Sequence, residues 1–197
     1  MTDELLKEKG EISTKENLRE QDVLLATGEQ ITIAKLSMCL SDLGYKAISL
    51  LGWQVPIITD SNYGDANVID IKTDRILKEL KEEKIVIIAG FQGVTRDNNI
   101  TTLGRNGSDT TAIAIAAALE EKECYIFTDT NGVYDKDPYK YKNAKKLDYI
   151  SYEDMEGMAK NGAKVLHDRC VVLAKKYGVK IIVKNTFNDE IGTIVGK

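Results

Sequence analysis

Short, almost uninterrupted apolar runs alternate with helical stretches along this chain, and that alternation restricts the fold more than any other feature. The runs cover residues 47–52, 68–71, 84–90, 124–129 and 179–185, with a last candidate at 192–195. Strands that are apolar along their whole length are typical of sheets covered on both faces. The pattern therefore predicts an α/β domain with a mostly parallel central sheet.

Helical patterns occupy the segments between these runs, at residues 23–43, 74–84, 108–121, 151–162 and 165–177. Gly44 and Gly178 follow two of them and suit the position after a helix end. Ser151 is an expected N-cap, with Asp154 three residues later. Because no linker or repeat interrupts the pattern, 197 residues predict a single domain covering residues 1–197.

Composition excludes several classes of protein. The net charge is −4 and the charges are interspersed, whereas a nucleic-acid-binding surface needs a basic stripe. No apolar run approaches the roughly 18 residues that span a bilayer, so we expect no membrane partner. Three widely spaced cysteines and one histidine argue against a zinc site and suit a reducing cytoplasm. The amino terminus is acidic and polar, unlike a signal peptide.

The stretch TTLGRNGSDTTA, residues 101–112, places a cation, a hydroxyl and a carboxylate where a helix is expected to begin. A helix N-terminus offers free N–H groups and a partial positive charge, so it can bind an anion. Arg105 presents a planar fork suited to carboxylate or phosphate, and Asp109 could hold an ammonium group or organise Mg²⁺. The alternative is that Ser108 only caps the helix and Arg105 is solvated.

A second candidate site follows the strand at 124–129, in the stretch TDTNGVYDKDP. Ligands of open α/β sheets bind beyond the carboxyl ends of strands, so this loop could hold a nucleotide. Its Asn-Gly and Asp-Pro pairs are equally ordinary turn signals. Glu29, Lys164 and His167 each have a plain alternative: a solvated glutamate, a surface lysine and a structural histidine.

Taken together, and in chain order, six strings resemble the aspartokinases, a branch of the amino acid kinase family. They are ATGEQIT (26–32), GFQGVT (90–95), TTLGRNGSDTTA (101–112), FTDTNGVYDKDP (127–138), NGAKVLH (161–167) and GTIV (192–195). The resemblance implies a three-layer αβα sandwich that transfers the γ-phosphoryl group of ATP, with Mg²⁺, to the side-chain carboxylate of L-aspartate. A different amino acid kinase is a weaker alternative, because the sister kinases that act on other amino acids or on UMP generally lack the arginine at the position of Arg105.

The resemblance also implies roles for individual residues. Arg105 would hold a substrate carboxylate, Glu29 would hold the substrate ammonium, and Phe91 would line the same pocket. The catalytic group would lie at the start of the helix, at Gly107, Ser108 and Asp109. The nucleotide side would comprise Thr128, Asp129, Tyr134, Asp137, Lys164 and Val165.

The chain also departs from the family pattern. Family members begin with a strand ending in K-F-G-G-T-S, whose lysine neutralises charge on the transferring phosphoryl group, and no K-x-G-G string occurs here. We also expect this chain to lack the regulatory ACT domains that usually follow GTIV in the family. Asn106, Tyr139 and Asp168 replace the more usual glycine, arginine and proline. We therefore expect an N-terminally incomplete catalytic domain, which forms homo-oligomers or associates with a fuller aspartokinase chain. The alternative is a non-catalytic fragment or interaction module.

Overall fold

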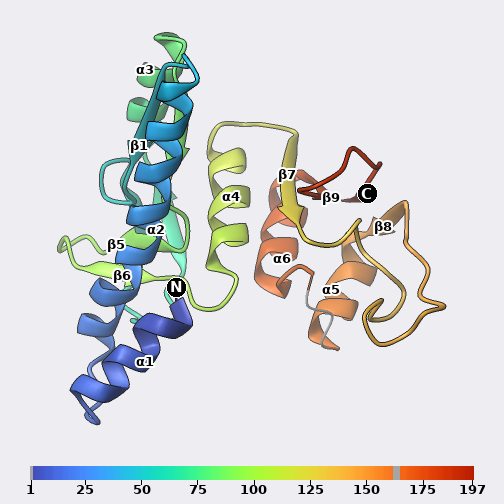
Figure 1. Ribbon diagram of the computed structural model, residues 1–197, viewed down its shortest axis with the longest axis horizontal. Helices are drawn as coiled ribbons and strands as arrows, with labels where there is room; N and C mark the ends of the chain where they lie inside the picture. Colours follow the sequence, from blue (N-terminus) through green and yellow to red (C-terminus); the bar gives the residue numbers. More distant parts are fainter. Residues whose placement is uncertain (1, 162–164) are drawn as a thin grey trace. The chain divides into compact units, whose positions relative to one another are not determined.

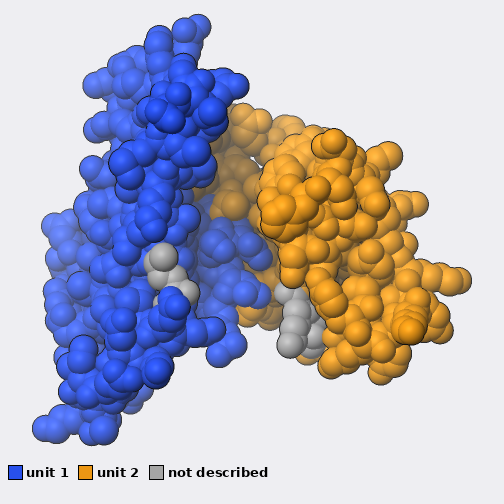
Figure 2. All heavy atoms as spheres, viewed as in Figure 1, with its two compact units in different colours: residues 1–111 blue, residues 112–197 orange. Residues whose placement is uncertain are grey.

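A computed structural model describes residues 2–161 and 165–197. The chain folds into two compact units, residues 1–111 and 112–197 (Figure 2). Helix α4 (Gly107–Ala118) begins in unit 1 and ends in unit 2. Each unit is described below by itself.

Unit 1 combines three complete helices with two small sheets (Figure 1). Its helices are α1 (Thr2–Ile12), α2 (Leu18–Asp42) and α3 (Asp74–Lys81). Its strands are β1 (Ala47–Leu50), β2 (Ile57–Thr59), β3 (Val68–Ile71), β4 (Ile85–Ile88), β5 (Gln92–Val94) and β6 (Ile100–Thr102). Strands β1 and β4 form a parallel pair, and the other four form a sheet in the order β3-β2-β5-β6.

Helix α2 is the central element of unit 1. Asn17 caps its start by accepting a hydrogen bond from the backbone N–H of Glu20. By length and composition alone it is the one described helix apolar enough to cross a membrane, a test that interior helices of globular units also pass. It packs on β1, β4 and β6, and the buried Gln92 of β5 donates a 3.0 Å bond to the Ala26 carbonyl. This packing buries Leu25, Ala26 and Ile33, whereas Ile31, Leu36 and Met38 of the same helix are exposed.

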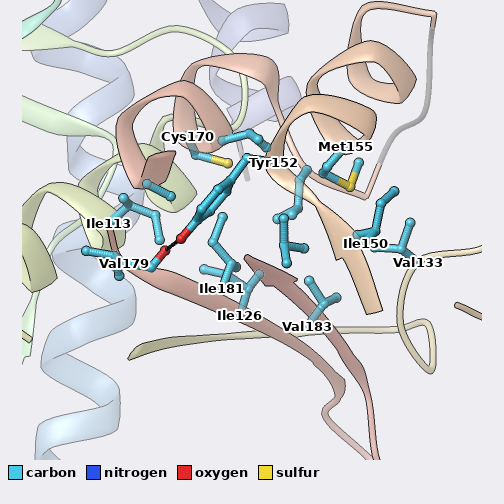
Figure 3. Close-up of a cluster of buried hydrophobic side chains, with 14 of the residues drawn as sticks. Ile113, Ile126, Val133, Ile150, Tyr152, Met155, Cys170, Val179, Ile181 and Val183 are labelled. Atoms are coloured by element: carbon cyan, nitrogen blue, oxygen red, sulfur yellow. Dashed lines mark hydrogen bonds between the residues drawn. The ribbon is translucent and has the colours of Figure 1, made fainter. Parts of the chain in front are cut away.

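Unit 2 is a four-stranded sheet with helices on one face. Its strands are β7 (Glu123–Thr128), β8 (Tyr149–Ser151), β9 (Lys180–Asn185) and β10 (Thr193–Gly196), in the order β7-β9-β10-β8. Helices α5 (Tyr152–Lys160) and α6 (Asp168–Tyr177) cover the sheet face that holds the hydrophobic core. Figure 3 shows Tyr152 in this core, where its hydroxyl donates a 2.8 Å bond to the Val179 carbonyl.

The predicted α/β class is confirmed, and every predicted strand is present. The pairing is mixed: β1–β4, β2–β5, β7–β9 and β8–β10 are parallel, whereas β2–β3, β5–β6 and β9–β10 are antiparallel. Helix α1 and the short strands β2, β5, β6 and β8 were not predicted. The predicted helix starting at residue 165 was wrong in its start: α6 begins at Asp168, and the His167 ring accepts a bond from the Arg169 N–H as its N-cap.

This capping bond favours the structural interpretation of His167. The same geometry explains Asp168, which occupies the first helical position where the aspartokinases usually have proline. An acidic side chain at that position is favourable because it faces the positive end of the helix dipole. At the other end of α6, Gly178 adopts the left-handed conformation (φ 69°), as its position after the helix predicted.

Candidate functional site

The loop that carries Arg105 is a tight turn between β6 and α4. Gly104 has φ +74°, a conformation that favours glycine, and a Cβ atom there would lie 2.3 Å from the Asp65 Oδ1 atom, so a larger residue would be strained and would displace the Asp65 carboxylate. The Gly107 N–H donates to the Gly104 carbonyl at 3.1 Å, which closes the turn. Asn106 adopts the left-handed region (φ 54°), which asparagine tolerates better than most side chains.

Helix α4 begins at Gly107, so Ser108 lies in its first turn and not before it. The interpretation of Ser108 as a simple cap therefore loses its basis. The Arg105 side chain is exposed and has no hydrogen-bond or ion-pair partner among the described residues. A cation is thus held beside a helix N-terminus with its donors available, which is a combination that suits an anionic ligand.

Phe91 has an unusual backbone conformation at the base of this loop. Its φ is +65°, which is rare for an aromatic residue. The Thr111 hydroxyl of α4 accepts a 3.0 Å bond from the Phe91 N–H, and the Phe91 carbonyl accepts a 2.8 Å bond from the Leu103 N–H. The Phe91 ring approaches Gly107 so closely that a Cβ atom there would lie 3.0 Å from ring atom Cδ2. Strain of this kind persists where the surroundings enforce it, commonly at functional sites.

Glu29 of α2 is the acidic member of this group. Its side chain is half-buried, and its Oε2 atom is buried without a hydrogen-bond partner among the described residues. Burial raises the pKa of the Glu29 carboxyl above its ordinary value of 4.5, although a backbone hydrogen bond at Glu29 itself acts in the opposite direction. A cationic ligand group would supply the missing partner.

These residues line one cavity of about 290 Å³, all within unit 1. The structure brings together five of the predicted residues there: Glu29, Phe91, Arg105, Gly107 and Ser108. The cavity holds the carboxylate of Glu29 and the guanidinium group of Arg105, so it matches a ligand that carries both an ammonium and a carboxylate group. Asp109 is half-buried one residue further along α4 and is not among the described residues that line this cavity. Its predicted role stays a prediction.

Sequence reasoning missed the contribution of α1 to this cavity. Thr2, Asp3 and Leu6 line it together with Gly104 and Asn106. Helix α1 buries none of its residues and shows only a weak apolar stripe, so its sequence gives little sign of packing beside a site. Gly104 and Asn106, by contrast, could have been predicted as lining residues, because they flank Arg105 in the sequence.

The second cavity, of about 600 Å³, lies in unit 2 beyond the end of β7. Thr128, Asp129, Tyr134, Asp137 and Val165, all predicted, line it. Lys164, the remaining predicted residue, lies outside the described residues. An isolated antiparallel bridge between Tyr134 and Lys146 fixes the backbone on one side of the cavity.

Tyr139 and two lysines were not predicted to belong to this cavity, although Tyr139 was noted as a departure from the family pattern. The Tyr139 hydroxyl donates a 3.4 Å bond to Asp129 Oδ2, and the charge of Asp129 raises the pKa of Tyr139 above its ordinary value of 10.0, with smaller contributions from burial and from this bond. Lys136 and Lys140 also line the cavity, so it retains cations where the usual arginine is replaced. Lysines spaced through a loop have no periodicity that would have identified them beforehand.

No group of three or more His, Cys, Asp or Glu residues within the described part of the chain could hold a metal ion on its own. Mg²⁺ does not require such a group, because it commonly binds through one or two carboxylates together with substrate phosphates. Asp129 and Asp137 line the cavity of unit 2 and provide carboxylates of that kind.

Comparison with known proteins places the chain in a family. The amino acid kinase family model matches residues 1–185. The chain belongs to the amino acid kinase family. Its relatives in this family include an aspartokinase from Bacillus sp. (strain MGA3), which is 50% identical over 194 residues, or 98% of this chain and 47% of the relative's length.

Solved structures of the same family support the fold. Aspartate kinase from Synechocystis superposes with a TM-score of 0.84 at 42% identity, covering 99% of this chain and 32% of that chain. E. coli aspartokinase III in complex with aspartate and ADP superposes with a TM-score of 0.88 at 28% identity, covering 99% of this chain and 44% of that chain. The predicted α/β sandwich of the amino acid kinase fold is confirmed. The chain spans about half the length of the curated relatives it matches.

Proposed function

We propose that this chain is catalytic-domain sequence of an aspartokinase, which transfers the γ-phosphoryl group of ATP to the side-chain carboxylate of L-aspartate. The observation that carries the proposal is the cavity of unit 1, where Glu29 and Arg105 supply opposite charges beside the α4 N-terminus. Relatives that are 50% identical are named aspartokinase, and the E. coli structure contains aspartate and ADP. The family assignment and the chemistry of the cavity therefore agree.

In this proposal the unit 1 residues bind and orient aspartate. Arg105 holds a carboxylate through paired N–H···O bonds, and Glu29 holds the ammonium group. The unsatisfied Oε2 atom of Glu29 supports that role, because a buried carboxylate oxygen without a partner is destabilising until a cation arrives. Phe91 closes one wall of the cavity.

The start of α4 supplies the stabilisation that phosphoryl transfer requires. Phosphoryl transfer depends on alignment and on stabilisation of charge at the equatorial oxygens more than on covalent chemistry. The backbone N–H groups at Ser108 and Asp109 lie in the first turn of α4 and are candidates for this stabilisation, whereas the Gly107 N–H already donates to the Gly104 carbonyl.

The unit 2 cavity is the proposed nucleotide site. Tyr134 would contact the base, with Thr128 and Val165 beside it, and Lys164 would contact phosphate. Asp129 and Asp137 would hold Mg²⁺ together with the phosphates, and the ion would neutralise developing charge there. Cys39, Cys124 and Cys170 form no disulfide within the described part of the chain, and three widely spaced cysteines suit a reducing cytoplasm, which is the location we propose.

The test is formation of aspartyl phosphate, trapped with hydroxylamine as the hydroxamate. The chain is incubated at stoichiometric concentration with MgATP and, in separate reactions, L-aspartate, L-glutamate or UMP. We expect product with aspartate alone. Comparable hydroxamate formation with glutamate, or comparable ADP release with UMP, whose product hydroxylamine does not trap, would overturn the substrate assignment. Aspartate binding without any transfer would favour the interaction module.

Replacing Tyr134 by alanine is expected to weaken nucleotide binding and leave aspartate binding nearly unchanged. Loss of base–aromatic contact is worth about 1–3 kcal/mol. Calorimetric titration with ADP and then with aspartate measures both affinities. Tyr177→Ala is the matched control, because Tyr177 is an exposed tyrosine of unit 2 that does not line the cavity. Unchanged ADP affinity in Tyr134→Ala would make Tyr134 a packing residue.

Aspartate affinity is expected to fall as the pH is lowered from 7 through the raised pKa of Glu29. Glu29 must be ionised to hold the ligand's ammonium group. Because burial raises the pKa of Glu29 above its ordinary value of 4.5, the loss of affinity begins at a higher pH than it would for an ordinary glutamate. Binding in that range should release ligand-linked protons, measured by calorimetry in buffers with different heats of ionisation. Glu29→Gln should bind weakly without this pH dependence. A parallel pH profile in both proteins would remove Glu29 from the site.

A further inference from the structure

Asp22 is a completely buried carboxylate that lies outside both cavities. Its Oδ2 atom accepts bonds from the backbone N–H groups of Gly64 and Thr102, each at 2.9 Å. Its Oδ1 atom accepts a 2.6 Å bond from the Thr102 hydroxyl. Burying a carboxylate is costly unless its oxygens are hydrogen-bonded, and here three donors compensate for the loss of water.

The three donors belong to the two segments that shape the Arg105 loop. Thr102 is the last residue of β6, three positions before Arg105. Gly64 precedes Asp65, whose carboxylate lies against Gly104, and the Ala66 N–H donates to the Thr102 carbonyl at 2.9 Å. Asp22 therefore ties helix α2 to the end of β6, which leads into the Gly104–Arg105 turn, and to the loop at Gly64 beside it.

The same helix carries Glu29, seven residues after Asp22. Seven residues are close to two helical turns, so the two side chains project from the same face of α2. Asp22 anchors that face to the Arg105 loop, and Glu29 enters the cavity from it. The position of Glu29 relative to Arg105 thus depends on the bonds that Asp22 makes.

We propose that Asp22 is a positioning residue that sets the separation between Glu29 and Arg105, and with it the spacing of ammonium and carboxylate groups in the bound amino acid. The proposal rests on the proposed function and deepens it by assigning the origin of the spacing selectivity. A residue that only stabilises unit 1 would have no specific effect on recognition. Loss of the Asp22 bonds, by contrast, should alter recognition of the ligand's ammonium and carboxylate groups together.

The test compares L-aspartate with succinate, which has both carboxylates but lacks the ammonium group. Their affinities for the 197-residue chain are measured by calorimetry at pH 7.5, with ADP binding in unit 2 as a check of folding. Asp22→Ala is expected to lose about 10-fold or more in aspartate affinity, the effect of a displaced charge-assisted bond. The ratio of aspartate to succinate affinity should fall with it, and ADP affinity should not change.

Two control variants separate positioning from charge and from general stability. Asp22→Asn should behave like the unsubstituted chain, because its carbonyl oxygen can accept both backbone N–H bonds and its amide can donate to the Thr102 hydroxyl. Glu79→Gln alters another buried helix carboxylate of unit 1, which is held by Arg75 and Lys84 and does not line either cavity. It should leave the affinity ratio unchanged.

If Asp22→Ala fails to fold, the pair Thr102→Val and Thr102→Ser decides. Valine removes the hydroxyl donor and should lower the affinity ratio, whereas serine keeps the donor and should preserve it. An unchanged ratio in a folded variant that lacks the anchor, or equal losses for aspartate, succinate and ADP, would overturn the proposal. Failure of the unsubstituted chain to bind aspartate would be seen first, and it would overturn the proposed function and this inference together.

Discussion

With MgATP and aspartate, the 197-residue chain alone is expected to form aspartyl phosphate at least about 10³-fold more slowly than the chain supplemented with a K-F-G-G-T-S strand segment. The family resemblance assigns the lysine of that segment to charge neutralisation at the transferring phosphoryl group, and no K-x-G-G string occurs here. One well-placed cation at this position can be worth roughly 10³–10⁵ in rate, as arginine fingers are. The hydroxamate assay measures both rates.

The sheets give a second reason for the same expectation. Among the described residues, β1 pairs only with β4, and β7 has a partner, β9, on one side only. Tyr125 and Phe127 of β7 are 51% and 61% exposed. Unpaired strand edges with apolar side chains promote association, and a two-stranded sheet is marginal by itself.

The added segment should therefore increase solubility as well as rate. Light scattering of the chain, with and without the segment, measures the first effect in the same samples. The matched control is a segment with the lysine replaced by methionine, which should restore solubility but little turnover. Robust turnover by the chain alone would contradict this account of its chemistry.

Replacing Arg105 by lysine is expected to weaken aspartate binding by about 1.5–3 kcal/mol and to leave nucleotide binding nearly unchanged. A guanidinium group binds a carboxylate through two parallel bonds, and an ammonium group cannot reproduce that geometry. Arg105 lines the unit 1 cavity, whereas all described residues that line the unit 2 cavity lie between Thr128 and Val165. The two affinities should therefore respond independently.

Calorimetric titrations with aspartate and with ADP supply both values for this variant. Arg96→Lys is the matched control, because Arg96 is an exposed arginine of unit 1 that does not line the cavity. Equal losses for aspartate and ADP in Arg105→Lys would contradict the assignment, since they would indicate a general loss of structure.

The sequence predicted the elements whose signals are long or strongly apolar. The runs around Ile85–Ile88 and Lys180–Asn185 are β-branched and continuous, and both form strands. Strand β5 consists of Gln92, Gly93 and Val94, which show neither alternation nor an apolar run. Such a strand exists because of tertiary contacts: Gly93 lies against Ile57 and Thr59 of β2, where a Cβ atom would clash.

The candidate site could be predicted in part for a similar reason. The family resemblance identified Glu29, Arg105 and Tyr134; Arg105 and Tyr134 lie in local turns with their own sequence signals, whereas Glu29 lies in the middle of α2 and was identified by the resemblance alone. The buried bonds of Asp22 could not be predicted, since they join α2 to Gly64 and Thr102, 42 and 80 residues away along the chain. An aspartate near the start of a helix would otherwise be interpreted as solvated or as a favourable charge near the helix dipole.

The most direct test of the central claim, that aspartate and nucleotide bind in different units, is a map of backbone amide chemical shifts. The chain is labelled with ¹⁵N and titrated separately with L-aspartate and with ADP. We predict that aspartate shifts the resonances of Glu29, Phe91 and residues 104–108, and that ADP shifts those of residues 128–139. Aspartate shifts centred on residues 128–139, or saturating aspartate that leaves residues 104–108 unshifted, would contradict the account.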